Sequence, residues 1–245
     1  MIQSAFFEEI QTGSGYKLGV RLAPDELLHI QGLIKAHLVE KIGEVNPEAV
    51  AEFKKVELGQ YHTVSHLINH AEVMKRVNRI MPLAFVNELR KTSMIQQLQA
   101  EFGDFVISDE EKVGRESVSL RFVRPESSTD IGSLHCDDWF WKIYDFPEPK
   151  GFDRVKVWTA ICCDTGLSGL YVVPHSQKRE WKYSVEEKAG MLKPVLDVEE
   201  KPELLLCPTQ PGDAVVFNYE SLHGGATSQG KQTRVSIEFT MLVKQ

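Results

Sequence analysis

The spacing of apolar residues divides the chain into two parts that meet near residue 105. Before that point, apolar residues recur at intervals of three and four, which is typical of helices that bury one face. The first run begins at Pro24 and Asp25 and stops near Gly43, and these residue types are typical of the start and the end of a helix. This part predicts four helices, over residues 24–43, 47–59, 63–80 and 82–101.

After residue 105 the apolar runs are short and β-like, with Gly, Pro, Asp and Ser between them. A parallel α/β sheet is disfavoured because the helices do not alternate with the strands. The pattern predicts a mainly β fold with helices (α+β), a double-stranded β-helix or jelly-roll, cupin-like barrel with the helical segment packed on one sheet. We expect a single domain over 1–245, with a mainly helical part at 1–103 and the barrel at 104–245. The predicted strands are 104–108, 117–124, 131–135, 154–162, 169–173, 203–207, 213–217 and 233–243.

Composition and charge narrow the class of protein. The 245 residues carry a formal net charge of −7, which argues against a broad nucleic-acid surface. No run approaches the roughly 18 apolar residues of a membrane span. The N-terminal MIQSAFFEEI is acidic where a signal peptide is basic, so we expect a cytoplasmic protein with no membrane partner. The four cysteines form no CxxC pair and are expected to be reduced thiols.

His135 and Asp137 form the first candidate metal motif, in the run Leu134-His135-Cys136-Asp137. In an extended segment, side chains two residues apart point to the same side, with Cα atoms about 6.6 Å apart. Both can then reach one ion at about 2.0–2.2 Å. An H-x-D motif alone occurs often by chance, so the prediction depends on what accompanies it.

A distal histidine and an arginine accompany it. His223 follows the apolar run 213–217 and precedes Gly224 and Gly225, which permit close approach of a ligand to the backbone. Two histidines and one carboxylate make the facial triad of non-haem iron(II) sites, which leaves coordination positions open for a 2-oxo acid and O₂. Arg234 lies on the last predicted strand, where a buried guanidinium needs an anion. The distal carboxylate of a 2-oxo acid would supply that anion through a bidentate pair.

The motifs in this order resemble the phytanoyl-CoA dioxygenase (PhyH) family of Fe(II)/2-oxoglutarate oxygenases. The resemblance covers roughly residues 115–243 and not the helical N-terminus. Its carriers are His135-Cys136-Asp137, VWTAI from Val157, SGLYVVPHS from Ser168 to Ser176, PGDAVVF from Pro211 to Phe217, His223-Gly224-Gly225 and Arg234. The chain departs from the family at Pro174-His175-Ser176-Gln177, where the family has P-G-S-H, and at Gly225, where many members have a hydroxyl residue.

The resemblance implies that His135, Asp137 and His223 bind Fe(II). It implies that Arg234 binds the 5-carboxylate of the co-substrate 2-oxoglutarate, that Trp158 lies near it, and that O₂ oxidises a small-molecule substrate with release of succinate and CO₂. A carboxylate at 137 favours hydroxylation, because related halogenases have a small residue there. Since Gly225 has no hydroxyl, we expect Thr227 or Arg121 to supply that hydrogen bond.

Other residues near these motifs are candidates for the substrate pocket. Aromatic residues follow the H-x-D motif, and we expect Trp139 and Trp141 to wall the pocket and Arg179 to contact substrate. An anionic substrate is one interpretation of the basic residues Arg115, Arg121, Arg124, Lys142, Arg154, Lys178, Arg179 and Lys182, and ordinary surface charge is the other.

Three further interpretations stay open. His62, His66 and His70 have helical i, i+4 spacing, which suits a metal site, but a solvated helix face is favoured. His175 is expected to be structural. A metal-binding cupin-type isomerase and a non-catalytic ligand-binding barrel remain the alternatives to an oxygenase. The isomerase gives Arg234 no role, and the complete triad speaks against a vestigial metal site in a binding barrel.

Overall fold

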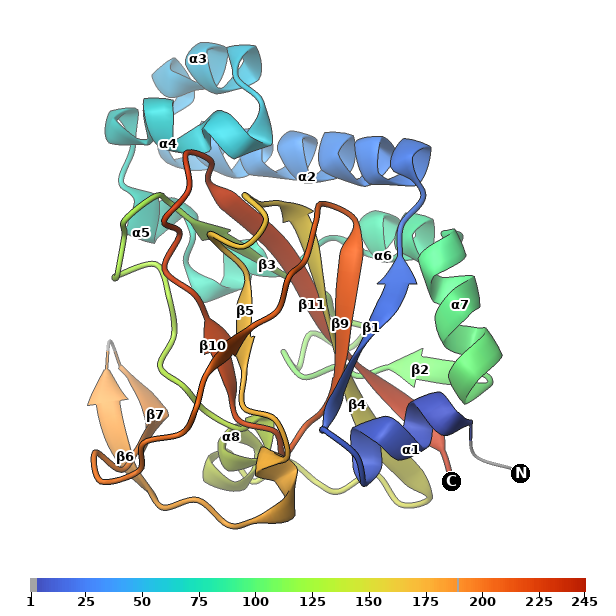
Figure 1. Cartoon of the computed structure of the whole chain (residues 1–245). Coiled ribbons are helices and arrows are strands. Elements are labelled where there is room, and N and C mark those ends of the chain that lie inside the picture. Colours follow the sequence, from blue (N-terminus) through green and yellow to red (C-terminus); the bar gives the residue numbers. More distant parts are fainter. Residues whose placement is uncertain (1–3, 189) are drawn as a thin grey trace.

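The computed structural model describes residues 4–188 and 190–245 (Figure 1). None of the described helices is both long and apolar enough to cross a membrane. The helices are α1 (Ala5–Gln11), α2 (Pro24–Val45), α3 (Val50–Lys55), α4 (Tyr61–Val64), α5 (His70–Val73), α6 (Leu83–Leu89), α7 (Ser93–Phe102) and α8 (Asp137–Ile143). Short 3₁₀ turns are η1 (Pro47–Ala49), η2 (Leu58–Gln60), η3 (Ser65–Leu67), η4 (Arg76–Arg79) and η5 (Ser176–Lys178).

The first predicted helix is confirmed, and the third is wrong. Helix α2 begins at Pro24, where the side chain of Glu26 accepts a hydrogen bond from the backbone N–H of Ala23. Residues 63–80 form short turns instead of one helix, because asparagine side chains bind the backbone there. Asn69 accepts from the N–H of Glu72, and the side chain of Asn78 donates to the carbonyl of Val73.

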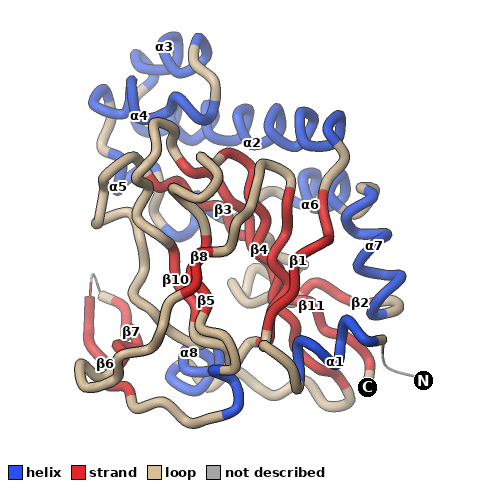
Figure 2. The backbone as a smooth tube through the Cα atoms, in the orientation of Figure 1, coloured by secondary structure: helices blue, strands red, loops and turns tan. Residues whose placement is uncertain are grey.

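In the described part of the chain, eleven strands form two antiparallel sheets and a hairpin (Figure 2). The six-stranded sheet has the order β1-β9-β4-β11-β2, with β3 also paired to β11, and the three-stranded sheet has the order β10-β5-β8. This is the jelly-roll, cupin-like architecture that the strand pattern predicted. The strands are β1 (Tyr16–Arg21), β2 (Phe105–Ile107), β3 (Ser119–Val123), β4 (Phe152–Cys162), β5 (Leu170–Val172), β6 (Tyr183–Lys188), β7 (Met191–Leu196), β8 (Leu205–Leu206), β9 (Asp213–Asn218), β10 (His223–Gly225) and β11 (Arg234–Lys244).

Four of these strands were not predicted. Strand β1 lies in the helical part and pairs with β9, β6 pairs with β7, and β10 is a short strand that begins at His223. The predicted strand 131–135 forms only an isolated bridge from His135 to His223. Such short or exposed segments carry too few apolar residues for the alternation to be visible.

The two long strands β4 and β11 have opposite chemistry on their two faces. Val157 of β4 and Ile237 of β11 pack with α2, α6 and α7 in the main hydrophobic core. The alternate residues, Lys156 and Trp158 of β4 and Glu238 of β11, line a cavity on the other side of the sheet. Helices therefore cover one face of the six-stranded sheet, and the other face is free to carry polar groups.

Candidate metal centre and cavity

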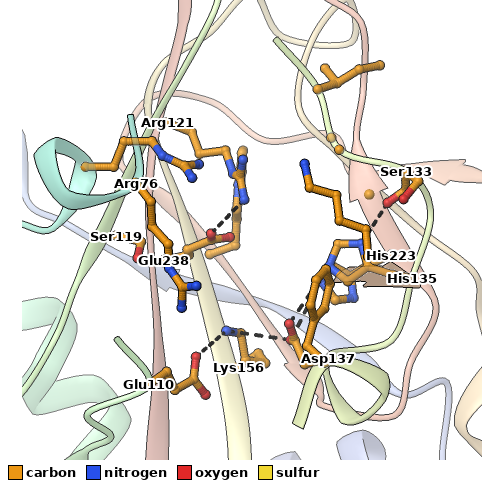
Figure 3. A pocket seen from close by; sticks show the side chains of 18 of the residues that line it. Arg76, Glu110, Ser119, Arg121, Ser133, His135, Asp137, Lys156, His223 and Glu238 are labelled. Atoms are coloured by element: carbon orange, nitrogen blue, oxygen red, sulfur yellow. Dashed lines mark hydrogen bonds and ion pairs between the residues drawn. The ribbon is translucent and has the colours of Figure 1, made fainter. Parts of the chain in front are cut away.

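His135, Asp137 and His223 converge at one end of the cavity (Figure 3). The backbones of His135 and His223 exchange hydrogen bonds of 3.0 and 2.9 Å, which fixes the two motifs side by side. Asp137 is the first residue of α8, and its backbone N–H donates to the carbonyl of Tyr219 at 3.0 Å. The predicted extended H-x-D segment is thus replaced by a bridge residue followed by a helix start.

The hydrogen bonds of both histidines show which ring nitrogen carries a proton. Nδ1 of His135 lies 2.7 Å from the carbonyl of Ser133, and Nδ1 of His223 lies 3.0 Å from the carbonyl of Ser221. A carbonyl can only accept, so each Nδ1 carries a proton, and in its neutral form each ring presents the unshared electron pair of Nε2. Burial and the neighbouring His223 lower the pKa of His135 to about 4, which keeps that ring neutral.

The three ligand atoms suit a cation. Nε2 of His135 lies 3.9 Å from Oδ1 of Asp137, and Nε2 of His223 lies 3.7 Å from Oδ2. One ion at about 2.0–2.2 Å from each atom can join ligands up to about 4.4 Å apart. Oδ2 of Asp137 is buried and has no hydrogen-bond partner among the described residues. Two imidazole nitrogens and a carboxylate that converge without hydrogen bonds to one another form a cluster that could hold a metal ion.

Arg234 occupies the interior of the same cavity. Its side chain is 1% exposed, Nη1 donates to the carbonyl of Gly169 at 2.9 Å, and the guanidinium lies 5.7 Å from the ring of Trp158. Burial and the nearby Arg121 lower the pKa of Arg234 to about 10, so the group remains a cation near neutral pH. Nε is buried without a partner within the described part of the chain, which leaves donors free for an anion.

Gly225 makes room for this arginine. A Cβ atom placed on Gly225 would lie only 2.7 Å from Nη2 of Arg234. The position at which many relatives have a hydroxyl is therefore filled here by the arginine itself. Thr227, which was expected to replace that hydroxyl, is half-buried and does not line the cavity.

The cavity has a volume of about 450 Å³. Of the predicted residues, Trp141, Trp158 and Arg121 line it, and Arg121 lies 3.5 Å from Glu238. Two predicted substrate residues do not line it. Trp139 is buried and stacks on Tyr183 at 4.3 Å, and Arg179 pairs with Glu200 on a side chain that is 53% exposed.

His62, His70 and His175 make hydrogen bonds outside the cavity. Nδ1 of His62 bonds to the hydroxyl of Thr233, and Nδ1 of His70 to that of Tyr61, so the predicted i, i+4 row does not form. Within the described residues, the one histidine, cysteine and carboxylate cluster that could hold a metal is His135, Asp137 and His223. His175 bonds to the carbonyl of Gly13. All four cysteines are buried and free.

Lys156 is the functional candidate that the sequence analysis missed. Its buried Nζ lies 3.6 Å from Oδ2 of Asp137 and 3.3 Å from Oε2 of Glu110 (Figure 3). Although burial acts in the opposite direction, Asp137 and Glu110 raise the pKa of Lys156 above its usual value. A signal was present, because Lys156 is in phase with Trp158 on a strand whose other face is apolar.

Comparisons with known proteins show the family of this chain. The sequence profile described as phytanoyl-CoA dioxygenase (PhyH) matches residues 38–236, so the resemblance extends into the helical part where none was expected. No curated protein matches the chain in sequence.

Similar solved structures include EctD from S. alaskensis with 2-oxoglutarate and 5-hydroxyectoine, at a TM-score of 0.56, 13% identity and coverage of 98% of this chain and 76% of that one. AviO1 from Streptomyces viridochromogenes Tue57 has a TM-score of 0.55 and 14% identity, with coverage of 98% of this chain and 94% of that one. The non-heme monooxygenase ThoJ has a TM-score of 0.55 and 12% identity, with coverage of 98% of this chain and 77% of that one. At these identities the likeness shows the shared fold, whereas the profile shows the family. The chain belongs to the phytanoyl-CoA dioxygenase family of non-haem iron oxygenases, whose cofactors are Fe(II) and 2-oxoglutarate.

Proposed function

We propose that this protein is a dioxygenase that hydroxylates a small molecule in the cavity, with conversion of 2-oxoglutarate to succinate and CO₂. In this proposal His135, Asp137 and His223 hold Fe(II), and Arg234 holds 2-oxoglutarate. The observation that carries it is the convergence of two imidazole Nε2 atoms on a carboxylate, with a buried arginine in the same cavity. An isomerase would give that arginine no role, and the complete set of three metal-binding side chains argues against a non-catalytic binding barrel.

The chain's own residues have distinct tasks in this reaction. Bound iron would supply the activation of O₂, and the protein supplies orientation and exclusion of water. The backbone carbonyls of Ser133 and Ser221 orient the two histidines by accepting from Nδ1. Arg234 would fix the far end of 2-oxoglutarate through its free donors. We keep Arg121 as a candidate neighbour of the co-substrate, since it lines the cavity.

Aromatic rings keep water away from this end of the cavity. The ring of Phe140 lies edge-on to His135 at 5.0 Å, and the ring of Phe217 lies 4.6 Å from that of His223. Trp141 and Trp158 also line the cavity. Such an apolar wall limits side reactions of a reactive intermediate with water.

Anaerobic spectroscopy tests the proposal. Protein, Fe(II) and 2-oxoglutarate mixed under nitrogen should give a weak visible charge-transfer band, and His135→Ala should lose both the band and tight iron binding. His175→Ala is the matched control, because that ring lies outside the cavity and should leave the band unchanged. The proposal is wrong if no band forms and His135→Ala binds iron as well as the parent protein. Where the band does form, succinate formation during a screen of metabolites would identify the substrate.

A further inference from the structure

Most charged side chains around the cavity are already paired. Nε of Arg76 lies 2.5 Å from Glu111, Arg121 lies 3.5 Å from Glu238, and Lys156 contacts Glu110 and Asp137. With Arg234 reserved for 2-oxoglutarate, the cations left over among the lining residues are Arg79, Lys188 and Lys193. The carboxylate left over is Glu186, so this region of the cavity has an excess of positive charge.

Arg79 is the most unusual of these groups. It ends the 3₁₀ turn η4 and is half-buried, and its buried Nε has no hydrogen-bond partner among the described residues. Burial and the neighbouring Arg121 lower the pKa of Arg79 to about 10. A guanidinium whose Nε is buried without a partner, beside a like-charged neighbour, is unfavourable unless an anion completes the site.

The hairpin β6–β7 supplies the other two cations. Lys193 lies opposite Glu186 in the register, and Lys188 lies opposite Met191. All four residues line the cavity, so one face of the hairpin forms a wall of it. No ion pair within 4.0 Å involves Lys188 or Lys193 in the described part of the chain. Nearby Lys188, Arg121 and Arg79 add to burial in lowering the pKa of Lys193.

We propose that Arg79, Lys188 and Lys193 bind an acidic group of the substrate, either a carboxylate or a phosphate. Arginine donates in a planar fork and lysine as a point charge, and together they suit an oxyanion. The inference rests on the proposed function, because the carbon to be oxidised must then lie toward His135, Asp137 and His223 in the same cavity. It also moves the anion site from the exposed Arg179 to residues on η4 and the hairpin.

Calorimetric titration of bare anions tests this site. The protein is saturated with Fe(II) and 2-oxoglutarate under nitrogen, so that Arg234 is occupied, and inorganic phosphate or acetate is added in a chloride-free buffer. Binding of either anion is expected, and the stronger of the two identifies the acidic group. Arg79→Gln and Lys193→Gln should each weaken that binding by about tenfold or more, as expected for loss of one charge-assisted hydrogen bond.

Matched controls separate this site from general charge effects. Arg90→Gln removes a paired arginine outside the cavity, and Lys182→Gln removes an exposed lysine just before the hairpin. Both should stay within about twofold of the parent protein. Arg79→Lys keeps the charge and should retain binding within several-fold, which guards against misfolding of the glutamine variant. Circular dichroism checks the fold of each variant.

The outcomes for the two proposals differ. Equal losses in Arg90→Gln and Arg79→Gln would overturn the anion site, as would a failure of both anions to bind. Anion binding in metal-free protein that is lost only in Arg234→Met would also overturn it, because the anion would then occupy the co-substrate position. If iron and 2-oxoglutarate do not bind but phosphate or acetate still binds through Arg79, the anion site stands and the oxygenase proposal fails.

Discussion

Replacing Arg234 with methionine should separate the binding of 2-oxoglutarate from the stability of the fold. Arg234 is 1% exposed and makes one hydrogen bond, from Nη1 to the carbonyl of Gly169. Two hydrogen bonds to a carboxylate are worth about 1.5–3 kcal/mol each. Their loss should weaken binding of 2-oxoglutarate by at least about a hundredfold, since 1.4 kcal/mol is about a factor of ten.

The free energy of unfolding should change much less. The variant loses the bond to Gly169, but it also removes a buried guanidinium whose desolvation costs several kcal/mol. These terms oppose one another, so we expect a net change within about 1 kcal/mol, or about 2–4 °C in Tm for a domain of this size. Methionine fills much of the same volume without a charge.

Thermal unfolding under nitrogen measures both effects. A 2-oxoglutarate concentration of 100 Kd should stabilise the metal-loaded parent by about 2.7 kcal/mol, or about 5–10 °C. At that concentration Arg234→Met should gain about 1 °C or less. Arg90→Met is the contrast, because Arg90 pairs with Glu116 outside the cavity. Arg90→Met should lower the Tm of the protein without ligand and keep the full increase in Tm on addition of 2-oxoglutarate. The reasoning fails if Arg234→Met keeps the shift, or if its own Tm falls by more than about 10 °C.

Three other changes test individual contacts. Asp130→Asn should destabilise the protein by about 2 kcal/mol at pH 7, because hydrogen bonds from Arg124 outweigh burial and lower the pKa of Asp130 to about 2. That stability is present above pH about 4 and is lost as the pH falls toward 2, so urea unfolding curves of parent and variant should converge there. Lys156→Met should lower the free energy of unfolding by about 2–3 kcal/mol, because it leaves the carboxylate of Glu110 uncompensated. Adding Glu110→Gln to this variant should recover much of the lost stability, and a further loss of stability would contradict the pairing. Gly225→Ala should displace Nη2 of Arg234 and weaken 2-oxoglutarate binding several-fold with little change in Tm; unchanged affinity would show that the arginine has room to move.

The parts of the fold that the sequence predicted are those with a long periodic signal. Helix α2 and strands β4, β9 and β11 each bury a continuous apolar row, which the alternation reveals. The region 63–80 also has apolar residues at helical spacing, but its asparagine side chains bind the backbone of short turns instead of continuing a helix. Whether a side chain hydrogen-bonds its own backbone depends on local geometry that periodicity does not contain.

The candidate metal ligands and Arg234 could be proposed from the sequence because their chemistry is rare in combination. The substrate side of the cavity could not, because its residues come from η4, β3 and the β6–β7 hairpin, which only tertiary structure brings together. Seven of the eight basic residues singled out by position near the motifs do not line the cavity, and Arg121 is the exception. Closeness along the chain was a poor guide to closeness in space.

The two faces of β11 explain why the polar residues of the site were hard to assign. Both faces are largely buried, one against helices and one toward the cavity, so exposure does not distinguish them. Arg234 and Glu238 share a face with Ser236 and Thr240, whose hydroxyls are buried without partners among the described residues. An apolar core would not tolerate four such groups in a row on one strand face. The row is compatible with folding because Glu238 pairs with Arg121, and because the cavity leaves space for ligands that complete the remaining hydrogen bonds. Alternation of polar and apolar residues on a strand with no solvent-exposed face therefore indicates a binding cavity.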